Sequence, residues 1–301
     1  MLSLFTIIHP LVDACSVSVL VAGGMTLERV IAYNAMAFAL QLPVGVLMDG
    51  WPRFNRAGFL LGTGLTLAGA VLAALGLGGW GVLASACVGN ALFHLTAGKH
   101  ILEAREGRAG PIGLFISTGA LGLMAGQVWA AKAAVPCLSV FAAALAACVV
   151  LAAMREWGGD GRMDALVQDG GAALLPMLVL LGLFALIAWR SWAGLFASGR
   201  SAGGCALMML AGAAVTFAGK VAGGYLAELL GRWKVTALSV AGSVALTFAC
   251  EPSWVAAWLA LLFVAQLATG PVLSLVYDKS CHRGGFAFGL NCLGLFAGSF
   301  A

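Results

Sequence analysis

Charged residues are scarce in this sequence. Only 9% of the 301 residues are Asp, Glu, Lys or Arg, whereas 62% are hydrophobic. Soluble domains carry roughly 25% charged residues, so the composition excludes a water-soluble fold. A bilayer is crossed by helices of about 20 apolar residues or by strands of alternating polarity. Because the apolar runs here are continuous, we expect an all-α polytopic membrane protein.

Several chemical motifs are also missing. The chain contains no P-loop, no HExxH and no CxxCH, so ATP-driven pumping is not built into it, and we predict neither an enzyme nor a bound cofactor. No basic run or patch suggests nucleic-acid binding. The eight cysteines stand singly, mostly within apolar segments, and we interpret them as small buried side chains rather than as disulfides or metal ligands. We predict no metal site.

Eleven apolar segments are long enough to be read as membrane spans. Short links join most of them, so successive helices should be antiparallel neighbours. The exception is the polar, glycine-rich segment 155–172, which we interpret as a cytoplasmic linker between an N-terminal half (1–154) and a C-terminal half (173–301). The predicted spans are 3–23, 30–49, 58–78, 80–102, 111–131, 134–154, 173–197, 203–228, 234–250, 253–277 and 284–301.

Loop charges predict the orientation, because cytoplasmic loops are enriched in Lys and Arg. With a cytoplasmic N-terminus, the outer loops hold three basic residues, namely Arg29, Lys132 and Arg200. The inner loops then hold ten, namely Arg53, Arg56, Arg105, Arg108, Arg155, Arg162, Arg232, Lys234, Lys279 and Arg283. We therefore place the N-terminus in the cytoplasm.

A short pattern occurs twice, each time at the exit of an apolar segment. The stretch GVLMDGWPRFNR begins at Gly45, and GYLAELLGRWK begins at Gly224, 179 positions later. A glycine, a leucine, an acid and an arginine recur at one register; the acid and arginine pairs are Asp49 with Glu228 and Arg53 with Arg232.

A second repeat links the predicted fifth and eleventh spans. GLFISTGALGLMAG begins at Gly113, and GFAFGLNCLGLFAG begins at Gly285, 172 positions later. Two separate matches indicate an internal duplication, which in a membrane chain is typical of transporters. By this repeat the span 134–154 should have a counterpart after Ala301, so we expect the sequence to be a truncated copy of a twelve-span protein.

These motifs resemble those of the major facilitator superfamily. Its G-x-L-x-D/E pattern with a basic turn lies between spans 2 and 3 and again between spans 8 and 9, where it is found here. The first copy departs from the usual form at Trp51 and Pro52, and the second has Glu228 for Asp. The resemblance, to a small bacterial branch, implies two pseudo-symmetric six-helix bundles, of which eleven spans are present. It says little about the substrate.

Asp13 is the clearest candidate for chemistry, because it lies near the centre of the first span. A charge at mid-bilayer costs about 2.5–3.5 kcal/mol on insertion scales. His9 lies one helical turn earlier on the same face, so the pair can serve as a proton site, or alternatively as a structural polar pair. Asn90 and His94 repeat this spacing in the fourth span, where a satisfied core histidine is the simpler interpretation.

Three cations lie inside or near the predicted spans. Arg190 cannot lose its proton; it could snorkel to the outer face, bind an anionic substrate group or pair with Asp13. Snorkelling to the interface explains Lys99. Lys220 occupies the position equivalent to Gln41 in the other half. Because both are polar, we expect both side chains to face protein rather than lipid, and we class them as second-line polar residues. A structural hydrogen bond is the simpler interpretation.

In the resembling family, spans 1, 4, 7 and 10 surround a central cavity. The resemblance therefore implies a cavity for substrate and protons lined by His9, Asp13, Asn90, His94, Arg190 and Gln266. One acid, one fixed cation and two imidazoles favour a carboxylate-bearing or zwitterionic small solute.

The repeated turns are predicted to form a cytoplasmic gate. Each acid can pair with the arginine beyond its turn, as Asp49 with Arg53 and Glu228 with Arg232. Alternatively, it can face the positive N-terminus of a neighbouring helix. Contacts of this kind can form in one cavity orientation and break in the other. The simpler interpretation is that these basic turns only orient insertion.

We therefore predict a secondary active transporter of the cell inner membrane, monomeric and driven by protons, that moves a small solute by alternating access. A membrane scaffold or sensor that kept the fold and lost transport is the alternative. An integral membrane enzyme would need a cluster of histidines or acids at a membrane surface, and the sequence shows none.

Overall fold

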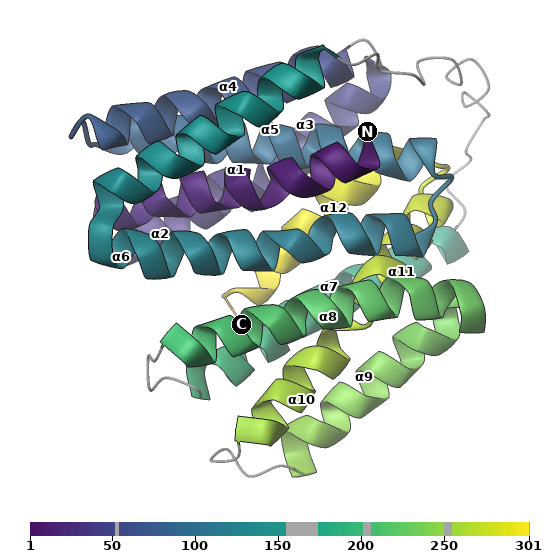
Figure 1. The fold of residues 1–301 in the computed structure, drawn as a ribbon. Coiled ribbons are helices and arrows are strands. Elements are labelled where there is room, and N and C mark those ends of the chain that lie inside the picture. The colour runs from purple at the N-terminus through teal and green to yellow at the C-terminus, as the bar shows by residue number, and fades with distance from the viewer. Residues whose placement is uncertain (52–53, 155–173, 201–205, 250–254, 301) are drawn as a thin grey trace.

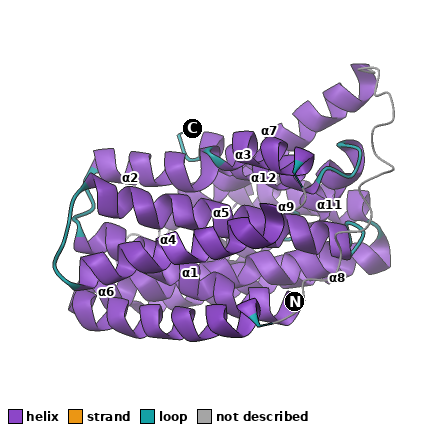
Figure 2. Cartoon of the chain, turned by 90° about the horizontal axis from the view of Figure 1, so that it is seen from above, coloured by secondary structure: helices purple, strands orange, loops and turns teal. Residues whose placement is uncertain are grey.

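The computed structural model describes residues 1–51, 54–154, 174–200, 206–249 and 255–300, with side chains of 174–175 and 194–200 left aside. All regular structure within these ranges is helical (Figure 1). The helices run along a nearly common direction, as the view from above shows (Figure 2). Helical structure is expected in a bilayer, because every backbone polar group must then be hydrogen-bonded within its own helix.

The first six labelled α-helices, with one π-helical turn, form the N-terminal group, defined as residues 2–153. They are α1 (Leu2–Ala22), α2 (Leu27–Asn34), η1 (Ala35–Ala39), α3 (Gln41–Gly50), α4 (Phe54–Ala74), α5 (Trp80–Ala104) and α6 (Ala109–Ala153). The C-terminal group covers residues 174–298. Its helices are α7 (Leu174–Arg200), α8 (Ala206–Leu230), α9 (Arg232–Ala249), α10 (Val255–Gln266), α11 (Thr269–Lys279) and α12 (Gly284–Gly298).

Eight helical stretches in the described residues are long and apolar enough to cross a membrane. The predicted second span is one of them, because α2, η1 and α3 form a continuous stretch from Leu27 to Gly50. The 45-residue α6 covers two predicted spans and leaves helical geometry at Ala133, between their expected bounds. Helix α12 is shorter, and α9 is not among the eight. The count of eleven spans stays a prediction, and the predicted linker 155–172 lies outside the described residues.

The predicted tenth span is broken near its middle. Helix α10 ends at Gln266 and α11 begins at Thr269, although the stretch Val255–Lys279 as a whole is apolar enough to span. Breaks of this kind occur at membrane depth where the freed backbone is buried in protein or lines a cavity. The break places two polar side chains, one from each helix, side by side.

Glycines let the two groups approach closely. Helix α3 packs on α12, and the first part of α6 packs on α8. A Cβ atom on Gly45 would collide with the carbonyl oxygen of Gly285, and one on Gly113 would lie 3.3 Å from the Cα atom of Gly224. These four glycines are the repeat positions found in the sequence, so the duplicated motifs meet across the interface between the groups.

We predict that Gly45→Ala weakens this interface. The added methyl group meets backbone rather than a flexible side chain, so α3 and α12 must separate. Overpacking of this kind costs about 1–3 kcal/mol and should lower the midpoint of thermal unfolding in detergent. Gly64→Ala is the control: its Cβ would meet no atom within 4 Å, so that variant should be as stable as wild type or more stable. Equal midpoints for the two variants would contradict the packing.

Candidate functional site

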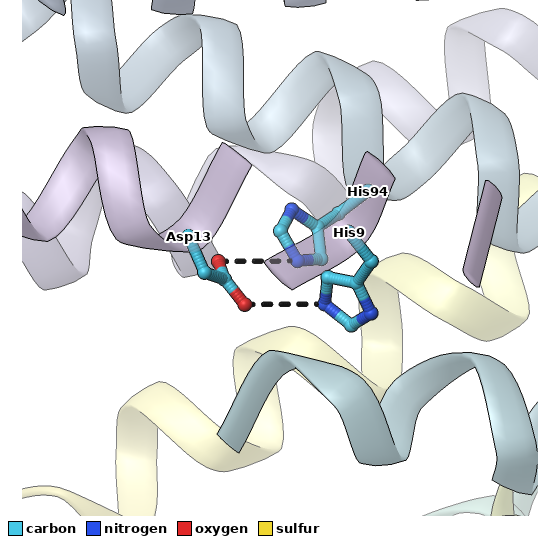
Figure 3. Close-up of side chains that lie close together, drawn as sticks. All are labelled: His9, Asp13 and His94. Carbon is cyan, nitrogen blue, oxygen red and sulfur yellow. Dashed lines mark ion pairs between the residues drawn. The ribbon is translucent and has the colours of Figure 1, made fainter. Parts of the chain in front are cut away.

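Two helices of the N-terminal group bring a carboxylate and two imidazoles together. His9 and Asp13 come from α1 and His94 comes from α5 (Figure 3). His9 Nε2 lies 3.2 Å from Asp13 Oδ2, and His94 Nε2 lies 3.4 Å from Asp13 Oδ1. All three residues are at most 9% exposed. We call His9, Asp13 and His94 the trio.

Both histidines of the trio are held by backbone carbonyls. His9 Nδ1 lies 2.7 Å from the carbonyl oxygen of Phe115, and His94 Nδ1 lies 2.8 Å from that of Asn90. A carbonyl oxygen can only accept, so each Nδ1 carries the proton that it donates. When the rings are neutral, both Nε2 atoms therefore present lone pairs to a carboxylate. Three acceptors face one another, and this arrangement is stable only with a cation among them.

Neighbouring residues complete the surroundings of Asp13. The side-chain amide of Asn90 donates to Asp13 Oδ1 at 2.8 Å and to Ser16 Oγ at 3.2 Å. Helix α6 closes another side: a Cβ on Gly119 would lie 2.5 Å from Asp13 Oδ2 and 2.6 Å from His9 Nε2. Glycine at this position therefore leaves room beside the acceptor atoms.

Arg190 of α7 is the charged centre of a second cluster. It is 6% exposed, so it does not snorkel to the surface. Its Nη1 donates to Gln266 Oε1 at 2.9 Å and to Thr269 Oγ1 at 2.8 Å, the two residues that flank the break between α10 and α11. Among the described residues no acceptor meets its buried Nε and Nη2. The possible pairing with Asp13 is wrong, because Asp13 is bound by the imidazoles and Asn90.

The structure thus divides the six predicted cavity residues into two clusters: His9, Asp13, Asn90 and His94 form one, and Arg190 and Gln266 form the other. Thr269 was missed, and a hydroxyl three residues after Gln266 was the only available signal. Of the second-line pair, Lys220 donates to the carbonyl oxygen of Ile116 at 3.1 Å. Gln41 donates to that of Ala37 at 2.6 Å. Both contacts agree with the simpler, structural interpretation.

Asp49 joins the two groups at the end where α3 meets α12. Its carboxylate accepts from the backbone N–H groups of Gly285 and Phe286, each at 2.8 Å. These donors belong to the first turn of α12, where unpaired N–H groups and the helix dipole stabilise an anion. The acid therefore adopts the second of the two expected arrangements. Arg53 lies outside the described residues.

The second copy of the motif makes a similar contact, this time from the C-terminal group to a helix of the N-terminal group. Glu228 of α8 accepts from the backbone N–H of Gly110 at 3.0 Å, in the first turn of α6, and from Arg108 at 2.6 Å. The predicted pairing of Glu228 with Arg232 is wrong. Arg232 instead pairs with Asp278 of α11 at 2.6 Å.

Lys99 also takes part in the contacts of Asp49, although it was expected to extend to the membrane interface. Its ammonium group binds Asp49 Oδ1 at 3.0 Å and also pairs with Glu103, one turn further along α5. The residue is 1% exposed, so the predicted snorkelling is wrong. The spacing of Lys99 and Glu103 could have indicated the pair. The contact with Asp49 could not be foreseen, since it depends on how α3 and α5 pack.

Solved structures share this arrangement over nearly its whole length. The E. coli fucose:proton symporter FucP superposes with a TM-score of 0.71 at 14% identity, over 99% of this chain and 88% of that one. A second FucP structure, described as a Major Facilitator Superfamily transporter in the outward conformation, gives 0.71 at 13%, over 98% and 89%. This chain has the major facilitator fold.

A third structure with the major facilitator fold superposes less closely on this chain. It is that of a bacterial homologue of the iron transporter ferroportin in an outward-facing state, with a TM-score of 0.53 at 17% identity, over 99% of this chain and 89% of that one. No family model and no curated protein sequence matches the chain. At these identities the likeness concerns the fold, which together with the apolar helices indicates a multi-pass membrane protein.

We predict that Lys99→Met destabilises the protein, because it leaves the Asp49 and Glu103 carboxylates without their shared cation. Removing one partner of a buried ion pair costs about 3 kcal/mol, so the midpoint of thermal unfolding should fall clearly. Lys234→Met removes an exposed lysine near the same end and should change stability by less than about 0.5 kcal/mol. A Lys99→Met midpoint at the wild-type value would exclude the contacts of Lys99 with Asp49 and Glu103.

Proposed function

We propose that this protein is a proton-coupled secondary transporter of the cell inner membrane. It moves a small solute by alternating access between two six-helix halves, residues 1–154 and 173–301, of which eleven spans lie in this sequence. It acts as a monomer with a cytoplasmic N-terminus, and its partners are the solute, protons and the lipid bilayer. The major facilitator fold supports this proposal, and one structural relative is described as a fucose:proton symporter.

One observation carries the proposal of proton coupling. In the trio, two imidazole nitrogens and one carboxylate, all buried, are directed at one another, and each imidazole donates its other ring proton to a backbone carbonyl. A proton shared between Asp13 and either histidine satisfies these acceptors, and its release leaves them in mutual repulsion. Loading and unloading therefore change the energy of the α1–α5 contact, which is what coupling between a proton and a conformational change requires.

The Arg190 cluster supports an anionic or zwitterionic substrate. The Nε and Nη2 atoms of Arg190 are buried and meet no acceptor among the residues that the structure describes, so together they present a fork that matches a carboxylate. Gln266 and Thr269 hold its third nitrogen, so the fork is fixed in place before a ligand binds. We assign the carboxylate of the solute to this position.

The contacts of Asp49 and Glu228 are proposed as the inner gate. Each acid binds the N-terminal turn of a helix in the other group, and each is reinforced by a cation, Lys99 or Arg108. These contacts close the end of the molecule that we assign to the cytoplasm. Opening that end would break both sets together, as expected for halves that rock against each other.

A membrane scaffold or sensor with the same fold remains the alternative function. It would need the polar clusters for packing only. Nε and Nη2 of Arg190 have no acceptor within the described part of the chain, which argues against it, because a purely structural role leaves no reason to bury unsatisfied donors.

We predict that Asp13→Asn abolishes solute uptake driven by an imposed pH gradient. Asparagine keeps the shape of the side chain but cannot bind and release a proton beside His9 and His94. The measurement uses proteoliposomes and a panel of small radiolabelled carboxylates and amino acids. His282→Gln changes an exposed histidine in a loop and serves as the control. Gradient-driven uptake by Asp13→Asn at the wild-type rate would contradict the proton assignment.

We predict that Arg190→Gln lowers the affinity for a transported carboxylate by about 30-fold or more, equivalent to about 2 kcal/mol, because the charged fork is lost. Competition of unlabelled carboxylates against uptake measures this change. Arg29→Gln, at a partly exposed position in the first turn of α2, should leave the affinity unchanged. Transport of a hydrophobic cation that Arg190→Ala abolishes, and that anions do not inhibit, would count against an anionic substrate.

A further inference from the structure

The trio also has the composition and spacing of a metal site. His9, Asp13 and His94 each offer one ligand atom, and these atoms lie within 4.8 Å of one another. A first-row metal ion binds imidazole nitrogen at about 2.0–2.1 Å and carboxylate oxygen at about 2.0–2.2 Å. Ligand atoms 3.2 and 3.4 Å apart can therefore surround one ion without a change of backbone.

The ligand atoms are in the chemical state that a metal ion requires. A histidine ligand must offer a neutral, unprotonated nitrogen, and its other nitrogen is usually bound to a carbonyl or carboxylate. Here both Nδ1 atoms donate to backbone carbonyls, those of Phe115 and Asn90, which leaves both Nε2 atoms free to ligate. The amide of Asn90 orients Asp13 in the same way. The outer contacts of all three ligands are thus already made.

The site also has room for an ion. Gly119 faces Asp13 Oδ2 and His9 Nε2, and a side chain there would occupy the space beside them. Two imidazoles and one carboxylate leave at least one coordination position open for water or a solute. A divalent ion with one carboxylate leaves a net charge of +1, which favours an anionic fourth ligand.

We propose that the trio binds one divalent first-row transition-metal ion, such as Co²⁺ or Zn²⁺, through His9 Nε2, Asp13 and His94 Nε2. This goes beyond the proposed transport function: the ion uses the atoms assigned there to the proton, so the metal ion and the proton compete for the trio. A metal site was not predicted from the sequence, because the two histidines lie on helices far apart in the chain and no short motif contains them. Mg²⁺ and Ca²⁺ prefer all-oxygen ligands, so the site should reject them.

Cobalt titration of the purified, full-length protein tests the proposal. With the affinity tag removed and the protein stripped by a chelator, Co²⁺ should produce visible d–d bands that saturate at one ion per chain. Zn²⁺ should displace Co²⁺, following the order of divalent-ion affinities, and excess Mg²⁺ should not. Absence of the bands, or their loss to Mg²⁺, would overturn the proposal.

Variants identify the ligands. His94→Gln and Asp13→Asn should each weaken Co²⁺ binding by about tenfold or more. Gly119→Ala should do the same by filling the space beside the ligand atoms. His282→Gln, which changes an exposed histidine, should bind as wild type does. Binding that is lost in His282→Gln and kept in His94→Gln would place the ion elsewhere and refute the site.

A spectroscopic measurement on unmutated protein covers the case in which the variants do not fold. Loaded with Cu²⁺, the wild-type protein should show electron spin-echo modulation from the remote nitrogens of two imidazoles. Modulation from fewer than two imidazoles would overturn the proposal.

Uptake driven by a pH gradient, measured in the presence of a chelator, separates the metal proposal from the transport proposal. Uptake without Co²⁺ binding refutes only the metal site. Co²⁺ binding without uptake refutes only the transporter.

Discussion

The contact between an acid and the first turn of a distant helix is the interaction on which the arrangement of this molecule depends. Asp49 binds the N-terminus of α12, and Glu228 binds that of α6. Each contact satisfies backbone donors that have no partner within their own helix. Each also joins the N-terminal group to the C-terminal group. Because the two acids belong to repeated motifs, the same type of acid–helix contact occurs twice, once from each group to the other.

Glycine makes these contacts possible. An acid near a helix end reaches the next helix only if the two backbones approach closely, and Gly45 and Gly224 permit this one turn before Asp49 and Glu228. In lipid there is no hydrophobic force between helices, so close packing and hydrogen bonds have to hold them together. The glycine, the acid and the helix terminus therefore act as one unit. The polar clusters of the trio and of Arg190 belong to different groups, and rocking of one group against the other would change the surroundings of both.

Much of this could be predicted from the sequence, because it depends on local pattern. Continuous apolar runs predicted the helices, and most predicted bounds lie within a few residues of the observed ones. The spacing of His9 and Asp13 predicted their contact, since residues four apart on a helix share a face. The two repeats at offsets of 179 and 172 predicted which positions are equivalent, and in the structure a copy of one repeat meets a copy of the other, Gly45 with Gly285 and Gly224 with Gly113.

What could not be predicted is the choice of partner between distant helices. Arg190 pairs with Gln266 rather than Asp13, Lys99 with Asp49 rather than the interface, and Arg232 with Asp278 rather than Glu228. Each choice is made by packing between segments far apart in the chain, on which a single sequence carries no information. For the same reason the meeting of His94 with Asp13 was expected only as a shared cavity and not as a direct contact.

We propose that the acid–helix contacts hold closed one of two states that interconvert. Pulsed electron–electron distance measurement between spin labels tests it most directly. The labels are placed at the exposed positions Met154 and Leu229, in a variant whose eight native cysteines are replaced. We expect a short and a long distance in wild type, with the long distance gaining population in Asp49→Asn. A single distance that is identical in wild type and Asp49→Asn would contradict it.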